Sequence, residues 1–214
     1  PAFSPLGGVA VVARNTWAAM QGRKALELVW EDSPHTQYDS ASYRQTLEKA
    51  ARAPGKSVRN EGDVTAAWGK AKPEQRITAE YYIPTLAHAS MEPPVATALV
   101  KDGQCEIWTS SQDPQTALNY VAKALGLPPE KVKVQCGLLG GGFGRKSKCD
   151  YVVEAALVAK AMPGTPVKLV WTREDDIQHD YYHAVAVEHL EAAIGKKGLP
   201  DSWLHRTVSP TISS

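Results

Sequence analysis

The sequence predicts an α+β fold in which mixed sheets are flanked by helices. Runs of apolar, β-branched and aromatic residues alternate along the chain with segments that carry helix caps and one apolar helical face. Glycine, proline and aspartate mark the turns between them. The chain has 214 residues, of which 43% are hydrophobic, and this proportion suffices for a folded globular core.

The first residues predict a β-α-β unit. Residues 9–13 and 26–30 have the apolar content of buried strands. Asn15 begins a helix between them, because its short side chain accepts hydrogen bonds from the amides of the first turn. Since the chain begins with Pro1 and not with Met, we expect an excised fragment or a processed chain.

A linker is predicted next. Residues 31–42 are polar and rich in turn formers, a helix spans 43–51, and Pro54 with Gly55 breaks it. A short helix then ends near residue 70, and the β-branched and aromatic residues of 76–83 indicate a strand.

Turn and cap residues give the clearest signals in the middle of the chain. Residues 95–100 and 106–109 flank an Asp-Gly pair at 102–103, which predicts a hairpin because glycine reaches positive φ without a steric penalty. The Asp-Pro pair at 113–114 predicts a helix start, and Gly126 predicts its end.

A glycine-rich loop is predicted to connect a strand to a helix. Residues 131–139 alternate as a strand, residues 140–144 form the loop, and Ser147 or Asp150 opens an apolar helix that reaches Met162. The last predicted elements are strands, which cover residues 167–171, 184–194 and 202–208.

Composition argues against several classes of function. Lys and Arg number 24 against 23 for Asp and Glu, so the net charge of +1 offers no broad attraction for nucleic acid. No apolar run approaches the ~20 residues that cross a bilayer, so we expect no membrane segment in this chain. The three cysteines form no CxxC pair, and we therefore expect no metal cluster bound by protein ligands.

The sequence GGGFGRK at residues 140–146 is the sharpest chemical signal. Bare backbone amides next to a helix start favour an anionic ligand. The dinucleotide pattern GxGxxG does not fit, whereas the phosphate-binding pattern GxxxxGK[ST] fails only because Arg145 replaces its second glycine. Taken alone, the loop is therefore either a P-loop-like nucleotide-binding site or a turn in a structural domain.

Further segments make the sequence resemble the molybdenum hydroxylase family, which includes xanthine dehydrogenase and aldehyde oxidoreductase. TSSQDPQ at 109–115 precedes GGGFGRK, with a separation of 143 − 112 = 31 residues from Gln112 to Phe143. AHASMEPP at 87–94 resembles the HxxMEP segment of that family. TREDDIQHDYYH at 172–183 resembles its isoquinoline 1-oxidoreductase branch.

The resemblance implies a fragment of a bacterial molybdopterin-binding catalytic subunit. Residues 1–35 would end a hammerhead domain, 36–72 would link, and 73–214 would form part of the first molybdopterin-binding domain. The complete enzyme would hydroxylate an aldehyde or an N-heteroaromatic carbon with water-derived oxygen, using molybdopterin cytosine dinucleotide and an iron-sulfur partner subunit. It would reside in the periplasm or cytoplasm. The fragment alone would be inactive, because the family's general-base glutamate lies outside it.

The resemblance also implies which residues form the site. Gln112 would be catalytic, through a hydrogen bond to an oxo ligand of molybdenum; alternatively its side chain only supports the Asp113 helix cap. The cofactor-binding residues would be Gly141, Gly142, Phe143, Gly144 and Arg145. No residue of this chain would ligate the metal.

Several polar residues near these motifs are open to more than one interpretation. The Arg145 guanidinium is predicted to reach the cofactor phosphate, the substrate or a neighbouring carboxylate. Ser147 stands where purine-oxidising relatives carry a substrate-binding glutamate, which argues against xanthine. A metal pair of His88 and Glu92 is not expected, because nearby prolines argue against the helix it would need. Residues 174–176 are expected to form a solvated acidic turn, and a cation site is the alternative.

Overall fold

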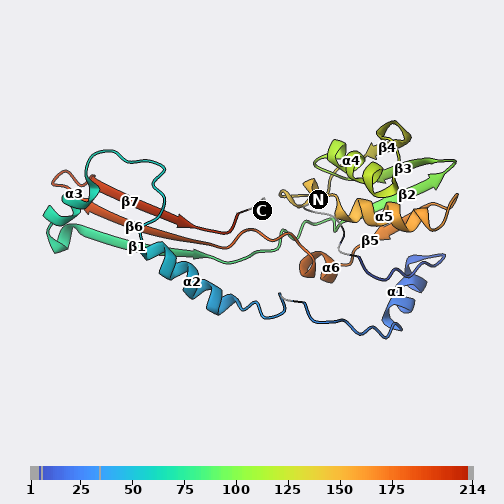
Figure 1. Ribbon diagram of the computed structural model, residues 1–214, viewed down its shortest axis with the longest axis horizontal. Coiled ribbons are helices and arrows are strands. Elements are labelled where there is room, and N and C mark those ends of the chain that lie inside the picture. Colours follow the sequence, from blue (N-terminus) through green and yellow to red (C-terminus); the bar gives the residue numbers. More distant parts are fainter. Residues whose placement is uncertain (1–4, 6, 34, 212–214) are drawn as a thin grey trace. The chain divides into compact units, whose positions relative to one another are not determined.

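The computed structural model describes residues 5, 7–33 and 35–211. The chain divides into two compact units (Figure 1). The first comprises Pro1–Trp30 and Ala87–Tyr182, and the second Glu31–Leu86 and His183–Ser214. Each contains one sheet and flanking helices, which confirms the predicted α+β class.

The first unit is built on a four-stranded mixed sheet. Its strands are β2 (Val95–Lys101), β3 (Gln104–Thr109), β4 (Val132–Cys136) and β5 (Val167–Val170), in the order β4-β3-β2-β5. β2 runs antiparallel to β3 and β5, while β3 and β4 are parallel. The predicted hairpin is confirmed: Asp102 and Gly103 turn the chain at φ of 49° and 71°, as a tight two-residue loop requires.

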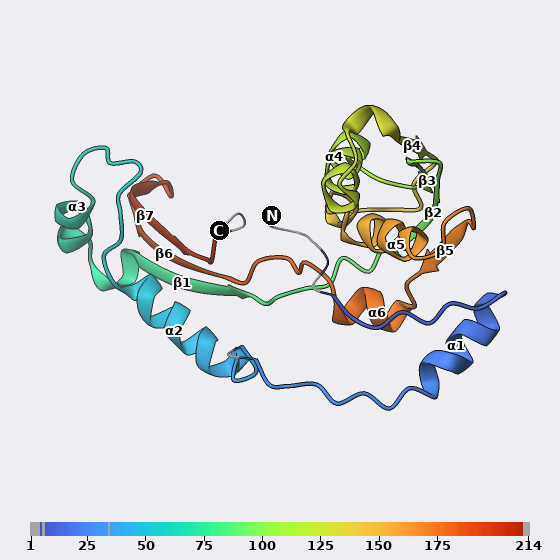
Figure 2. The same cartoon turned by 45° about the vertical axis from the view of Figure 1, so that its right-hand side comes forward.

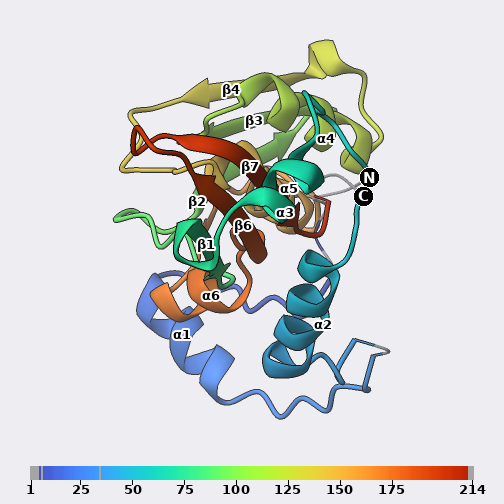
Figure 3. The ribbon, with the colours of Figure 1, turned by 90° about the vertical axis from the view of Figure 1, so that its left-hand side faces the viewer.

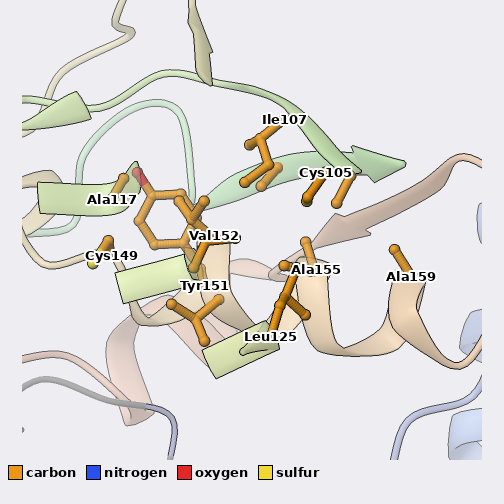
Figure 4. Packing of buried hydrophobic residues seen from close by; sticks show 14 of the residues in the cluster. Cys105, Ile107, Ala117, Leu125, Cys149, Tyr151, Val152, Ala155 and Ala159 are labelled. Carbon is orange, nitrogen blue, oxygen red and sulfur yellow. The ribbon is translucent and has the colours of Figure 1, made fainter. Parts of the chain in front are cut away.

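Two helices cover one face of this sheet (Figure 2). They are α4 (Pro114–Leu125) and α5 (Asp150–Lys160). Ala96 and Ala98 face them from β2, and their small side chains let α5 pack closely on that strand. Figure 4 shows Ile107 and Tyr151 among the buried side chains of this core, and the Tyr151 hydroxyl donates to the Ser110 carbonyl at 2.7 Å.

The caps of α4 are those that the sequence predicts. The Asp113 carboxylate accepts from the Thr116 amide at 3.0 Å, and Pro114 occupies the first turn. Gly126 ends the helix in the left-handed region at φ 71°. The short 3₁₀ turn η2 (Pro129–Lys131) then leads into β4.

The predicted β-α-β unit at the beginning of the chain is wrong in its strands. Helix α1 (Thr16–Lys24) forms, with Asn15 accepting from the Ala18 amide at 2.9 Å. Residues 9–13 and 26–30, however, pair with no strand in the described part of the chain. Most of their apolar side chains are exposed. A strand-like composition yields a strand only where a sheet edge is available for pairing.

The acidic residues 174–176 lie in a short helix, α6 (Arg173–Gln178), and not in the predicted turn. Thr172 and Asp175 cap it reciprocally. The Asp175 carboxylate also accepts hydrogen bonds from both terminal guanidinium nitrogens of Arg23 in α1, at 2.6 and 2.7 Å. These contacts explain the acidic run structurally, and the cation site that it offered as an alternative is not needed.

The second unit is a three-stranded antiparallel sheet with helices beside it (Figure 3). Its small core is formed where Leu47 and Ala51, from the helix at residues 40–52, pack against Val185 and Val187. The strands are β1 (Arg76–Ile83), β6 (Ala186–Ile194) and β7 (Pro200–Val208), and the helical elements are α2 (Ser40–Arg52), α3 (Val64–Lys70) and the 3₁₀ turn η1 (Pro73–Gln75). All three predicted strands of this unit are confirmed within two residues at their ends.

Candidate functional site

The glycine-rich loop connects β4 to the 3₁₀ turn η3 (Arg145–Ser147), which leads to α5. Gly141 and Gly144 have φ of 96° and 100°, in the region that only glycine adopts cheaply. Phe143 is also left-handed, at φ 53°, although it carries a side chain, and that side chain is 74% exposed. A strained, exposed loop of this kind is typical of a ligand-binding segment.

Gln112 contacts this loop directly. Its Oε1 accepts from the Gly144 amide at 3.0 Å, and its backbone amide donates to the Lys146 carbonyl at 3.1 Å. A Cβ on Gly142 would lie 2.7 Å from Cδ of Gln112, so only glycine allows this contact. The Asp113 cap is complete without the Gln112 side chain, and the capping role considered for Gln112 therefore does not apply.

The side-chain amide nitrogen of Gln112, Nε2, has no hydrogen-bond partner among the described residues. Because Oε1 is already occupied by Gly144, the side chain is fixed with this nitrogen as its remaining polar group. Gln112 thus offers a neutral hydrogen-bond donor beside a loop of bare backbone.

Glu92 binds the residues at both ends of the loop, Gly140 and Lys146. Its Oε2 accepts from Lys146 Nζ at 2.5 Å, from Ser110 Oγ at 2.7 Å and from the Gly140 amide at 3.2 Å. Burial alone would raise the pKa of the Glu92 carboxyl, but these hydrogen bonds outweigh it and hold the pKa below its usual value. Glu92 is therefore the ionised anchor of the loop.

Lys146 is not available to a phosphate, because its side chain is 1% exposed and paired with Glu92. A P-loop lysine must reach the ligand's phosphates, and Arg145 also stands where that loop needs a bare backbone. These two observations remove the nucleotide-binding alternative.

The side chain of Arg145 turns inward. It donates to both oxygens of Asp150 at 2.9 Å, and its Nε lies 3.0 Å from Oδ1 of Asp180. Its guanidinium lies 5.3 Å from the ring centre of Trp171 and 4.9 Å from that of Tyr181. Burial alone would lower the pKa of Arg145, but the two carboxylates raise it above its usual value.

Of the three partners open to Arg145 from the sequence, the structure therefore supports the neighbouring carboxylate. The side chain is 1% exposed, so a direct contact between its guanidinium and a cofactor phosphate or substrate is not what the structure shows. Only the backbone of Arg145 belongs to the loop surface, where its amide donates to the Gly142 carbonyl at 2.8 Å.

His88 and Glu92 do not act as a pair. His88 binds Asp180, whereas Glu92 binds Lys146 and Ser110. In the described ranges, no three His, Cys, Asp or Glu side chains gather in a way that could hold a metal ion.

A groove of about 350 Å³ lies at the open end of β3 and β4. Its walls include Trp108, Gln135 and Glu92, and it reaches Gly137 and Leu138, which precede the loop. Residues 140–144, Phe143 included, do not line this groove.

The comparison with protein families identifies this arrangement. The family model of the molybdopterin cofactor-binding domain matches residues 49–202. The chain belongs to this family. The matched range includes Gln112, Glu92 and the whole glycine-rich loop.

Known relatives agree with this family. The chain is 35% identical over 189 residues to the membrane-bound aldehyde dehydrogenase [pyrroloquinoline-quinone] of Gluconacetobacter polyoxogenes, covering 87% of this chain and 24% of that protein. It is 31% identical over 222 residues to the isoquinoline 1-oxidoreductase subunit beta of Brevundimonas diminuta, covering 93% and 28%. The chain thus spans about a quarter of the length of these curated relatives.

The fold is likewise found among solved structures. The aldehyde oxidoreductase of Desulfovibrio gigas superposes on 69% of this chain and 16% of its own chain, with a TM-score of 0.60 and 23% identity. No helix of the described residues is both long and apolar enough to cross a membrane.

Sequence reasoning missed Glu92, Asp150 and Asp180 as the carboxylates that hold the loop. The segments AHASMEPP and HDYYH carried the signal for Glu92 and Asp180, but their partners Lys146 and Arg145 are 54 and 35 residues away in sequence. Only the fold brings these groups together.

Proposed function

We propose that this chain forms one wall of the molybdenum cofactor site in the catalytic subunit of an oxidoreductase. The observation that carries the proposal is the contact of Gln112 with Gly144 at 3.0 Å, which leaves a neutral donor beside an exposed glycine loop. Membership of the molybdopterin cofactor-binding family supports the same role for this loop.

The residues present fit a bulky anionic cofactor. A Cβ at Gly144 would meet Nε2 of His88 at an ordinary contact distance of 3.9 Å, so no neighbouring side chain crowds this position. Gln112 adds a donor without adding charge, and the buried cations Arg145 and Lys146 are already balanced by carboxylates. Buried ion pairs therefore hold the loop in place, while Phe143 within it is exposed.

Each residue of the site then has a distinct task. When bound, the molybdenum cofactor supplies the chemistry of two-electron oxidation and of oxygen transfer from water. Gln112 donates a hydrogen bond that orients the oxo group, and Gly142 keeps the space that the Gln112 side chain requires. Glu92 and Arg145 hold the loop through their buried partners. Gly141 and Phe143 complete the proposed cofactor-binding loop.

The finer features of the complete protein are part of the same proposal. The cofactor is the cytosine dinucleotide form, the electrons pass to an iron-sulfur subunit, and the substrate is an aldehyde or an N-heteroaromatic compound. Residues 1–35 end a hammerhead domain, 36–72 link, and 73–214 begin the cofactor domain. The general base is contributed from outside this chain, so the isolated chain is expected to be inactive.

The name of one relative raises a second cofactor, pyrroloquinoline quinone. The two possibilities are separated by analysing the complete protein, purified from a host that makes both cofactors. We expect stoichiometric molybdenum, with cytidine monophosphate released on acid hydrolysis, and oxidation of an aldehyde or heteroaromatic substrate in a dye-reduction assay. Bound quinone without molybdenum would overturn the proposal.

A further inference from the structure

We propose that His88 is a further ligand-contacting residue of the glycine loop, held in place by Asp180. The inference rests on the proposed function, because the ligand is the cofactor seated on the loop. His88 would form a hydrogen bond there through its Nε2 atom.

Asp180 fixes His88 through two groups at once. Its carboxylate accepts from the His88 backbone amide at 2.5 Å and lies 2.9 Å from Nδ1 of the ring. Directly after His88 the chain bends through Ala89, a residue with a side chain at φ 44°. Such a conformation persists only where surrounding contacts impose it. The ring of His88 is thus placed by specific contacts and is not free to rotate.

The pairing with Asp180 also leaves one ring nitrogen unused. A carboxylate can only accept, so Nδ1 carries a hydrogen and Nε2 is the remaining polar atom of the ring. Among the described residues Nε2 has no hydrogen-bond partner, although the side chain is only 17% exposed. A half-buried ring with one satisfied and one unused nitrogen is suited to contact a ligand.

The unused nitrogen lies at the loop. Nε2 of His88 is 3.9 Å from the Cβ position of Gly144, the residue whose amide donates to Gln112. The donor on Gln112 and the ring nitrogen of His88 therefore flank one glycine. A ligand on this loop meets two hydrogen-bonding groups, which suits a heterocyclic cofactor that carries donors and acceptors.

The charges around Asp180 favour a role beyond folding. Arg145 already forms a bidentate pair with Asp150, so one positive charge faces two buried carboxylates. Asp180, with a fully buried side chain, is therefore not required to neutralise Arg145. Its remaining partners are the two N–H groups of His88, and orienting that residue is the function its position supports.

The test uses the complete protein in a host that makes the molybdenum cofactor. We compare wild type with His88→Leu, which removes the ring nitrogens, His88→Gln, which keeps a polar group of similar reach, and Asp180→Asn. His35→Gln, at an exposed histidine, is the matched control. Two quantities are measured: the rate at which molybdenum is lost during dialysis, and the melting temperature of the cofactor-free protein.

We expect His88→Leu and Asp180→Asn to lose molybdenum on the order of tenfold faster than wild type, as for other residues that orient metal-site ligands. His88→Gln and His35→Gln should lose it at nearly the wild-type rate. The cofactor-free His88→Leu protein should melt below wild type, because the buried Asp180 loses a hydrogen bond, whereas His88→Gln, which can still donate to Asp180, should melt close to wild type.

The outcomes separate this inference from the proposed function. A wild-type protein without molybdenum overturns both. A wild-type protein with molybdenum, together with a His88→Leu variant that retains it equally long, overturns only the role of His88. So does a His88→Gln variant that loses molybdenum as fast as His88→Leu.

Discussion

Gln112 lies next to both the Asp113 cap of α4 and the glycine-rich loop. Its side chain serves only the loop. We expect Gln112→Ala in the complete protein to retain molybdenum and to lower turnover about 10- to 100-fold, because it removes one orienting hydrogen bond. Gln115→Ala, at an exposed glutamine in the helix α4 that follows Gln112, is the control. Full activity of Gln112→Ala would contradict this role.

Glu92 is the single carboxylate that neutralises buried Lys146. Glu92→Gln keeps the shape but leaves the ammonium without its counter-charge, and we expect a loss of roughly 1–3 kcal/mol in the free energy of unfolding. Urea denaturation measures it. Glu106→Gln, which affects a looser pair with Lys133 at 3.6 Å, should have little effect. Equal stability of the two variants would show that the Lys146 pair contributes nothing.

At the level of single residues, the sequence predicted the contact of Gln112 with the loop but not the groups that hold the loop. The 31-residue spacing and the glycines can be recognised in the sequence without a structure. The direction of the Arg145 side chain cannot be predicted from nearby residues alone, because it depends on where the fold places Asp150 and Asp180. Predicting it requires the packing of α5 and of the residues that follow α6.

The second unit's sheet carries its own pH dependence. Arg52 first, and then His189, lower the pKa of Glu80 to about 2, from an ordinary value of 4.5. Hydrogen bonds with Glu191 and then Glu80 raise the pKa of His189 above its ordinary 6.5. The contributions of Glu80 and His189 to the free energy of unfolding are both complete only between these two ordinary values.

The signs follow from linkage. The Glu80 contribution is present above pH 4.5 and is lost as the pH falls toward 2, while that of His189 is present below pH 6.5 and is lost as the pH rises through its raised pKa. We expect the melting temperature of the chain to fall on both sides of this window. In His189→Gln the alkaline decline attributed to this residue should disappear; an unchanged alkaline limb would contradict its origin in His189.

Among the elements, those with local caps were predicted best. Helix α4 has its Asp113 and Gly126 caps, and the β2–β3 hairpin has its Asp102-Gly103 turn, so both carry their boundaries in the sequence. The strands expected at residues 9–13 and 26–30 had only apolar composition. A strand depends on a partner that its own residues do not specify, and composition alone therefore misleads.

For the whole molecule, the family is the coarsest and firmest result, since its model covers residues 49–202. The open loop and the unused donor of Gln112 explain why this part of the protein suits a large cofactor. Substrate and electron partner depend on parts of the relatives beyond the quarter that this chain spans. That is why they stand as proposals.

The central claim is that the Gln112 contact and the glycine loop form a wall of the molybdenum cofactor site. Mass-spectrometric determination of molybdenum per polypeptide tests it in the complete protein as wild type, Gly142→Val and Gly137→Val. A side chain at Gly142 collides with Gln112, whereas Gly137 has open space around its Cβ position. We predict stoichiometric molybdenum in wild type and Gly137→Val and none in Gly142→Val. A Gly142→Val protein that folds and retains the full molybdenum content would contradict the claim.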